Sequence, residues 1–203
     1  MTLGRNFRRI AVGYCLLYLH FKLNGFDLLP NFVGWVLFHR AILGLKEERP
    51  KLMLLKNFAL ALGAWSVVEW MPVSLTEELG LSGLPGVGLP GLVFQLMSLY
   101  FHFQFLTELA ELAGTYQDEL SRQDHRGSLL HARTGVTVLQ TVSVLLAAIP
   151  FEHWLSEWNA EWVETLAAVG LLIFTLVFCV TIVWELFSLA KEMEQICPKT
   201  DKN

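Results

Sequence analysis

Long apolar runs separated by short polar stretches dominate the pattern of this chain. Six runs predict helices that cross a bilayer: 10–26, 28–45, 52–73, 89–109, 134–149 (entering as early as Leu129) and 163–189. A crossing helix needs ~20 mostly apolar residues, with a range of about 17 to 25. Backbone polar groups in hydrocarbon must be satisfied within their own segment, so such runs predict helices. We therefore predict an all-α polytopic membrane bundle with six transmembrane helices, in one domain over 1–203.

The first two runs leave the number of crossings open. Both are short, and only Asn24-Gly25-Phe26-Asp27 separates their apolar parts. They are also compatible with a hairpin that does not fully cross the bilayer. In that case four helices cross, and the two chain ends still lie on the same side.

Composition points to the same environment. Hydrophobic residues make up 54% of the 203 residues and charged residues only 17%, whereas a soluble domain carries about 25% charged residues. The net charge of −4 argues against a basic nucleic-acid binder, and the apolar content excludes a disordered chain. We expect the lipid bilayer as the main partner and no nucleic acid.

The positions of the basic residues predict an orientation. Lys and Arg concentrate in the cytoplasmic loops of membrane proteins. With the N-terminus inside, all of the 15 basic residues except Lys22 fall in the inner loops and tails. Lys22 could extend its side chain to the headgroups. The charges therefore predict that both termini are cytoplasmic and that the number of crossings is even.

Polar residues within apolar spans are costly, so each needs a partner or a water-filled cavity. In the run 89–109, Gln95, Ser98 and His102 recur at helical spacing and share one face. A second row, offset around the helix, holds Gln104, Glu108 and Glu111. These rows predict either a polar cavity or proton path, or hydrogen bonds between helices. Gln95, His102, Gln104 and Glu108 are accordingly binding candidates.

Two further binding candidates lie near the outer ends of their spans. Glu69 closes the run 52–73, and His20 lies near the end of the first run. Glu69 could face a cavity or reach the headgroups, and His20 could approach it if the two spans touch.

The outer loop after Pro150 is acidic and aromatic. Trp154, Trp158 and Trp162 recur every four residues and form one helical stripe. This spacing is typical of an interfacial helix whose tryptophans lie at headgroup level. The other interpretation is an aromatic cage for a cationic solute, with glutamates nearby.

Sequence motifs for catalysis or cofactor binding are scarce. The stretch 86–91 formally matches GxGxxG, but it follows the outer end of a predicted membrane helix rather than a strand. Cys15, Cys179 and Cys197 are too widely spaced for a metal pair or a disulfide framework. We expect no metal and no cofactor.

The stretch Asp27-Leu28-Leu29-Pro30-Asn31-Phe32-Val33-Gly34-Trp35 is the most distinctive motif. It resembles a motif of uncharacterised multi-pass membrane proteins of Firmicutes, placed between two short N-terminal spans. The resemblance implies a bacterial cytoplasmic membrane and no known activity. Pro30 can start a helix that Asp27 or Asn31 caps, and Gly34 allows another helix to approach closely. A ligand role at this helix N-terminus is the alternative.

These patterns favour a non-enzymatic membrane component that binds or transports a small solute, or a subunit of a larger assembly with a membrane protein partner. One alternative is the substrate-binding subunit of a vitamin or metal uptake transporter, which would have similar size and span count. The other is an intramembrane enzyme acting on lipid or peptide, with His102 and Glu108 as its catalytic pair.

Overall fold

The computed structural model describes residues 3–18, 22–23, 26–27, 31–70, 89–120, 124–148 and 161–196. Its helices in chain order are α1 (Leu3–Tyr18), α2 (Asn31–Gly44), α3 (Lys56–Trp70), α5 (Leu89–Thr115), α6 (His125–Ala148) and α8 (Glu161–Ile196). A 3₁₀ turn, η1 (Pro50–Leu55), leads into α3. The predicted all-α class with six helices is confirmed in the described part of the chain, apart from one pair of two-residue strands.

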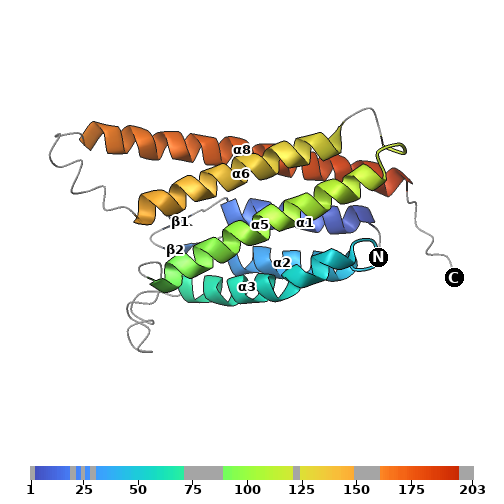
Figure 1. Ribbon diagram of the computed structural model, residues 1–203, viewed down its shortest axis with the longest axis horizontal. Coiled ribbons are helices and arrows are strands. Elements are labelled where there is room, and N and C mark those ends of the chain that lie inside the picture. The colour runs from blue at the N-terminus through green and yellow to red at the C-terminus, as the bar shows by residue number, and fades with distance from the viewer. Residues whose placement is uncertain are drawn as a thin grey trace.

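The helices form a closed ring in which neighbours in sequence are neighbours in space. Each described helix contacts the next one along the chain, and α8 returns to contact α1. Successive helices run in alternating directions, with α6 and α8 along one side, α2 and α3 along the other, and α1 and α5 between them (Figure 1). An ion pair of 2.9 Å joins Arg8 on α1 to Glu194 on α8. The beginning of α1 and the end of α8 therefore lie at the same end of the bundle.

The first two helices differ most from the predicted spans. α1 begins at Leu3 rather than at residue 10, and it ends at Tyr18. The helix predicted to continue to residue 26 is wrong, because β1 (Lys22–Leu23) and β2 (Phe26–Asp27) pair as antiparallel strands. Their register pairs Lys22 with Asp27 and Leu23 with Phe26.

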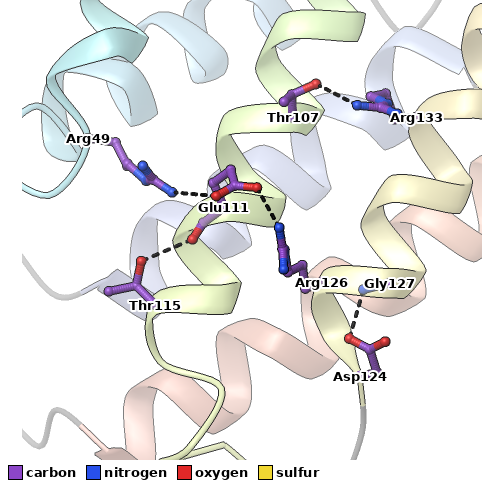
Figure 2. A network of polar contacts seen from close by, with 8 residues as sticks. All are labelled: Arg49, Thr107, Glu111, Thr115, Asp124, Arg126, Gly127 and Arg133. Atoms are coloured by element: carbon purple, nitrogen blue, oxygen red, sulfur yellow. Dashed lines mark hydrogen bonds and ion pairs between the residues drawn. The ribbon is translucent and has the colours of Figure 1, made fainter.

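The later helices extend beyond their apolar runs at the end of the bundle that holds the Arg8–Glu194 pair. α5 continues to Thr115 and α8 to Ile196. α6 begins at His125, before both the predicted start at residue 134 and the alternative entry at Leu129. Asp124 explains this early start, because its Oδ1 accepts a hydrogen bond of 2.8 Å from the backbone N–H of Gly127 (Figure 2) and so caps the helix.

A charged network lies at this same end, which we call the inner end. Glu111 on α5 pairs with Arg126 on α6 at 2.9 Å and with Arg49, between α2 and η1, at 3.7 Å (Figure 2). Three segments far apart in the sequence are thereby held together. Exposed ion pairs contribute little each, so their main effect is to set which segments meet.

The core follows the contact between α1, α2 and α5. Tyr14, Phe38, Phe101 and Phe105 are fully buried there, and the rings of Phe38 and Phe105 lie 5.3 Å apart. The outer surface is also apolar, since on α8 Leu172, Phe174, Val180 and other large side chains are exposed. Two described segments, Pro50–Trp70 and Val169–Ile196, are long and apolar enough to cross a membrane, by length and composition alone.

Helices α1 and α2 cross closely. A Cβ added at Gly34 would lie 2.9 Å from the carbonyl oxygen of Gly13, and one added at Gly13 would lie 2.6 Å from the ring of Phe38. Glycine is required at both positions because a side chain would force the two backbones apart.

This crossing generates the first prediction. Gly34→Ala should lower the midpoint of thermal unfolding in detergent, at a cost of about 1–3 kcal/mol, because overpacking shifts backbone. Gly170→Ala on α8 is the matched control, since nothing lies within 4 Å of its added Cβ. There alanine should be neutral or should stabilise by up to about 1 kcal/mol, through its higher helix propensity. Equal midpoints for the two variants would contradict the close crossing.

Candidate functional site

A cavity of about 200 Å³ lies at the end of the bundle opposite the charged network, where α2 and α5 begin and α3 ends. We call it the outer pocket. α1 contributes Leu17, and the other three helices contribute the rest of the described lining: Asn31, Trp35, Leu62, Trp65, Ser66, Glu69, Gly91, Phe94, Gln95 and Ser98. The wall is therefore mixed, with one carboxylate, two amides, two hydroxyls and three aromatic rings.

One face of α3 supplies the charged part of the pocket. Trp65 and Glu69 are four residues apart and so lie one above the other. The indole Nε1–H of Trp65 donates a hydrogen bond of 2.7 Å to Glu69 Oε1. The Trp65 ring also stacks on Phe94 of α5, with 4.1 Å between centroids and 12° between planes. The stack holds the indole, and the indole in turn orients the carboxylate.

The amides and hydroxyls come from three different helices. Asn31 is the first residue of α2, Ser66 lies on α3, and Gln95 and Ser98 lie on one face of α5. Gly91 of α5 also lines the cavity. Together these groups can donate and accept hydrogen bonds around a small polar molecule.

Trp35 separates this pocket from His102. Trp35 lines the pocket, and its ring lies 5.6 Å from the imidazole of His102. His102 is only 3% exposed, and its Nδ1 lies 3.3 Å from the Tyr14 hydroxyl, at hydrogen-bond distance. The sequence placed Gln95, Ser98 and His102 on one face. The structure puts Gln95 and Ser98 in a cavity and His102 in an aromatic core beneath it.

Gln104 and Glu108 lie deeper, toward the inner end. Gln104 Nε2 donates a hydrogen bond of 3.3 Å to Glu108 Oε1, and the Glu108 side chain is buried. Glu108 is 13 positions beyond Gln95, which is ~20 Å along a helix. His102 and Glu108 bond to different partners, so the structure does not bring them together as a pair.

Of the remaining candidates, Glu69 and Asn31 line the pocket, and Gly34 lies at the α1–α2 crossing. Asp27 belongs to β2, of which only the backbone is described. His20, Pro30, Trp154 and Trp158 lie outside the described residues, as does the side chain of Trp162. The expected approach of His20 to Glu69 therefore stays a prediction.

The structure adds a buried ionic cluster at the inner end. His125 is fully buried, with Nδ1 at 2.6 Å from Glu185 Oε1 and Nε2 at 3.3 Å from Glu192 Oε1. The hydrogen bond to Glu185 raises the pKa of His125 above its ordinary value of 6.5; burial opposes this effect, and Glu192 adds to it. In the sequence, the one sign of this cluster was that Glu185 and Glu192 are seven residues apart, which puts them on the same face of α8.

No family model, no curated protein and no solved structure matches this chain. Evidence for a function therefore comes from the pocket, the surface and the charges of the molecule itself.

The His125 cluster generates the second prediction. A raised folded-state pKa stabilises the fold below the unfolded-state value of about 6.5, and the effect is lost as pH rises through the folded-state value. The unfolding midpoint should therefore fall as pH rises from about 6 to about 9. His125→Gln should remove this dependence, measured by thermal unfolding in detergent.

His131→Gln serves as the control, because His131 is exposed on the same helix and its Nδ1 bonds the carbonyl of Gly127. This variant should retain the pH dependence of the parent protein. A pH dependence that is unchanged in His125→Gln would contradict the role of the cluster.

Proposed function

We propose that this chain is a multi-pass protein of the bacterial cytoplasmic membrane that binds a small polar solute in the outer pocket, as a non-enzymatic binding or transport component. The outer pocket is the observation that carries the proposal. Polar groups within a membrane domain are costly unless they are paired or face a cavity, and here four helices contribute such groups or walls to a single cavity.

The apolar residues on the surface support the placement of this protein in a membrane. Trp184 and Leu54 are each 73% exposed, and Val180 is 63% exposed. Between α6 and α8 lies a groove of about 550 Å³ lined almost wholly by apolar groups, among them Val138, Phe174 and Phe178. Acyl chains would cover such surfaces, whereas large exposed apolar patches are rare on soluble monomers.

Outward-facing hydroxyls support the same environment. Thr134 and Thr141 on α6 and Thr181 on α8 are exposed, and each donates a hydrogen bond to the backbone carbonyl four residues earlier. These bonds leave no hydroxyl hydrogen unpaired at these positions, as hydrocarbon requires.

The charges support the orientation. Arg8, Arg49 and Arg126 all pair at the inner end, which we assign to the cytoplasm because basic residues concentrate there. The outer pocket then opens toward the external leaflet. A solute would reach it from outside.

We propose that α1 and α2 each cross the bilayer although they are short, because the strands β1 and β2 extend them at the outer end. α1 has 16 residues and α2 has 14, which reach ~24 Å and ~21 Å against ~30 Å of hydrocarbon, and the part of α1 that follows Arg9 reaches only ~14 Å. β1 and β2 add length at the outer end and pair their backbone groups with each other. Non-helical backbone is tolerated at membrane depth where it is buried in protein or lines a cavity. We propose six crossings on this basis.

The topology generates the third prediction. In a background in which the native cysteines are replaced by serine, Ser82→Cys and Ser156→Cys should react with an impermeant maleimide added to intact bacterial cells. Glu47→Cys and Asp118→Cys should react only after lysis. Labelling of Glu47→Cys in intact cells would contradict the orientation, and a chain that stays dispersed without detergent would contradict insertion.

The pocket generates the fourth prediction. Across a panel of neutral, anionic and cationic small solutes, at least one should raise the unfolding midpoint of the protein in lipid nanodiscs, because a ligand that binds only the folded state stabilises it. A Ser66→Val, Gln95→Leu double variant should lose that response, and Glu47→Gln at the inner end should keep it. A flat response to the whole panel would contradict solute binding.

A further inference from the structure

We infer that the ligand of the outer pocket is a small substituted ammonium ion, held between the Glu69 carboxylate and the aromatic rings beside it. This inference rests on the proposed function and specifies the chemistry of its ligand. The charge of the pocket is the first argument. Among the lining residues that the structure describes, Glu69 is the one charged group, so a ligand with a single positive charge would neutralise it.

Glu69 retains capacity for a ligand. Its Oε1 accepts one hydrogen bond, from Trp65 at 2.7 Å, while an ionised carboxylate offers about four acceptor sites. The Trp65 bond also holds the carboxylate in place before a ligand arrives. Such preorganisation reduces the entropy lost on binding.

The aromatic rings are the second argument. Trp35, Trp65 and Phe94 all line the cavity, and Trp65 is fixed by its stack on Phe94 at 4.1 Å. The face of an aromatic ring attracts cations, most strongly in Trp, and groups of such rings recognise quaternary ammonium ligands. The cavity therefore combines two attractions for a cation, the charge of the carboxylate and the faces of the aromatic rings. Neither the carboxylate nor the rings would attract an anion.

The volume of the cavity and its neutral polar side chains limit which ammonium ions would fit. The cavity of about 200 Å³ holds the liquid volume of roughly seven waters and is smaller than the ~300–1,000 Å³ typical of pockets for drug-sized ligands. Ser66, Gln95 and Ser98 can bond a hydroxyl or ester oxygen on the ligand. The chemistry that fits is a short alkylammonium carrying one such oxygen.

Two sources supply this chemistry in a membrane. One is a free amino alcohol such as choline or ethanolamine, and the other is the headgroup of a phospholipid that contains the same ammonium group. The pocket lies near the level at which headgroups are found in the proposed orientation. Both sources would place the cation against Glu69.

The test uses the full-length protein in nanodiscs of phosphatidylglycerol, which carries no ammonium group. Choline and tetramethylammonium should raise the unfolding midpoint and quench tryptophan fluorescence with saturation. The neutral isostere 3,3-dimethyl-1-butanol, which has choline's shape without its charge, should bind roughly tenfold more weakly or not at all. Equal binding of choline and this isostere would overturn the inference while leaving solute binding in place.

Variants locate the cation. Glu69→Gln should weaken choline binding roughly tenfold or more, because it removes the opposing charge, and Glu47→Gln should leave binding unchanged. Trp65→Phe should weaken binding less than Trp65→Leu, which removes the ring altogether. Unchanged binding in a folded Glu69→Gln protein would overturn the inference. If that variant fails to fold, the comparison of choline with its neutral isostere still decides the question on the unaltered chain.

The lipid composition distinguishes the sources. If the ligand is a headgroup, nanodiscs of phosphatidylcholine or phosphatidylethanolamine should abolish the response to added choline, because the pocket is already occupied. If the ligand is a free solute, the response should be the same in all three lipids. Either result supports an ammonium ligand. No response to either cation in phosphatidylglycerol, with binding of a neutral or anionic solute in the panel, would overturn it.

Discussion

Helices α1 and α2 cross so closely that the carbonyl oxygen of Gly13 occupies the space beside Gly34 where a side chain would begin. This contact brings Tyr14 of α1 to 4.9 Å from Phe38 of α2, measured between ring centroids. Both residues, together with Trp35, then face α5 and enclose His102. Trp35 lines the outer pocket and also packs against His102, so this one residue borders both the pocket and the core.

The two ends of the bundle are built differently. At the inner end, Glu111 joins α5 to two other segments, and His125 joins α6 to two carboxylates of α8. Each contact there connects segments that are distant in the sequence. At the outer end, α2, α3 and α5 contribute neutral polar groups, aromatic rings and one carboxylate around an open space. The inner end also borders a cavity of about 310 Å³, lined in part by Lys191 and Glu192 of α8. The two ends therefore differ in their ion pairs and in the aromatic and neutral polar side chains that gather at the outer end.

Polar residues on the apolar helices therefore have two different roles here. His102 is close to Tyr14, Gln104 bonds Oε1 of Glu108, and the exposed threonines bond their own helices, so each of these side chains has a partner within the protein. Glu69, Gln95 and Ser66 line a cavity instead. The helical spacing of Gln95 and His102 predicted a shared face, and that face exists. Spacing within one helix could not show that Trp35 of a neighbouring helix packs against this face beside His102.

The sequence alone predicted the all-α class, the six helices and the approximate place of most of them along the chain, and it showed the basic residues gathered at alternate connections. Run length and charge position determine these features directly. The sequence did not predict the bounds of α1 or the early start of α6. The tertiary structure decided which faces meet: the Gly13–Gly34 contact, the burial of His125 between Glu185 and Glu192, and the pairing of Trp65 with Phe94 and Glu69. A binding site assembled from several helices depends on their rotation and crossing, and the packing of side chains distant in sequence sets both.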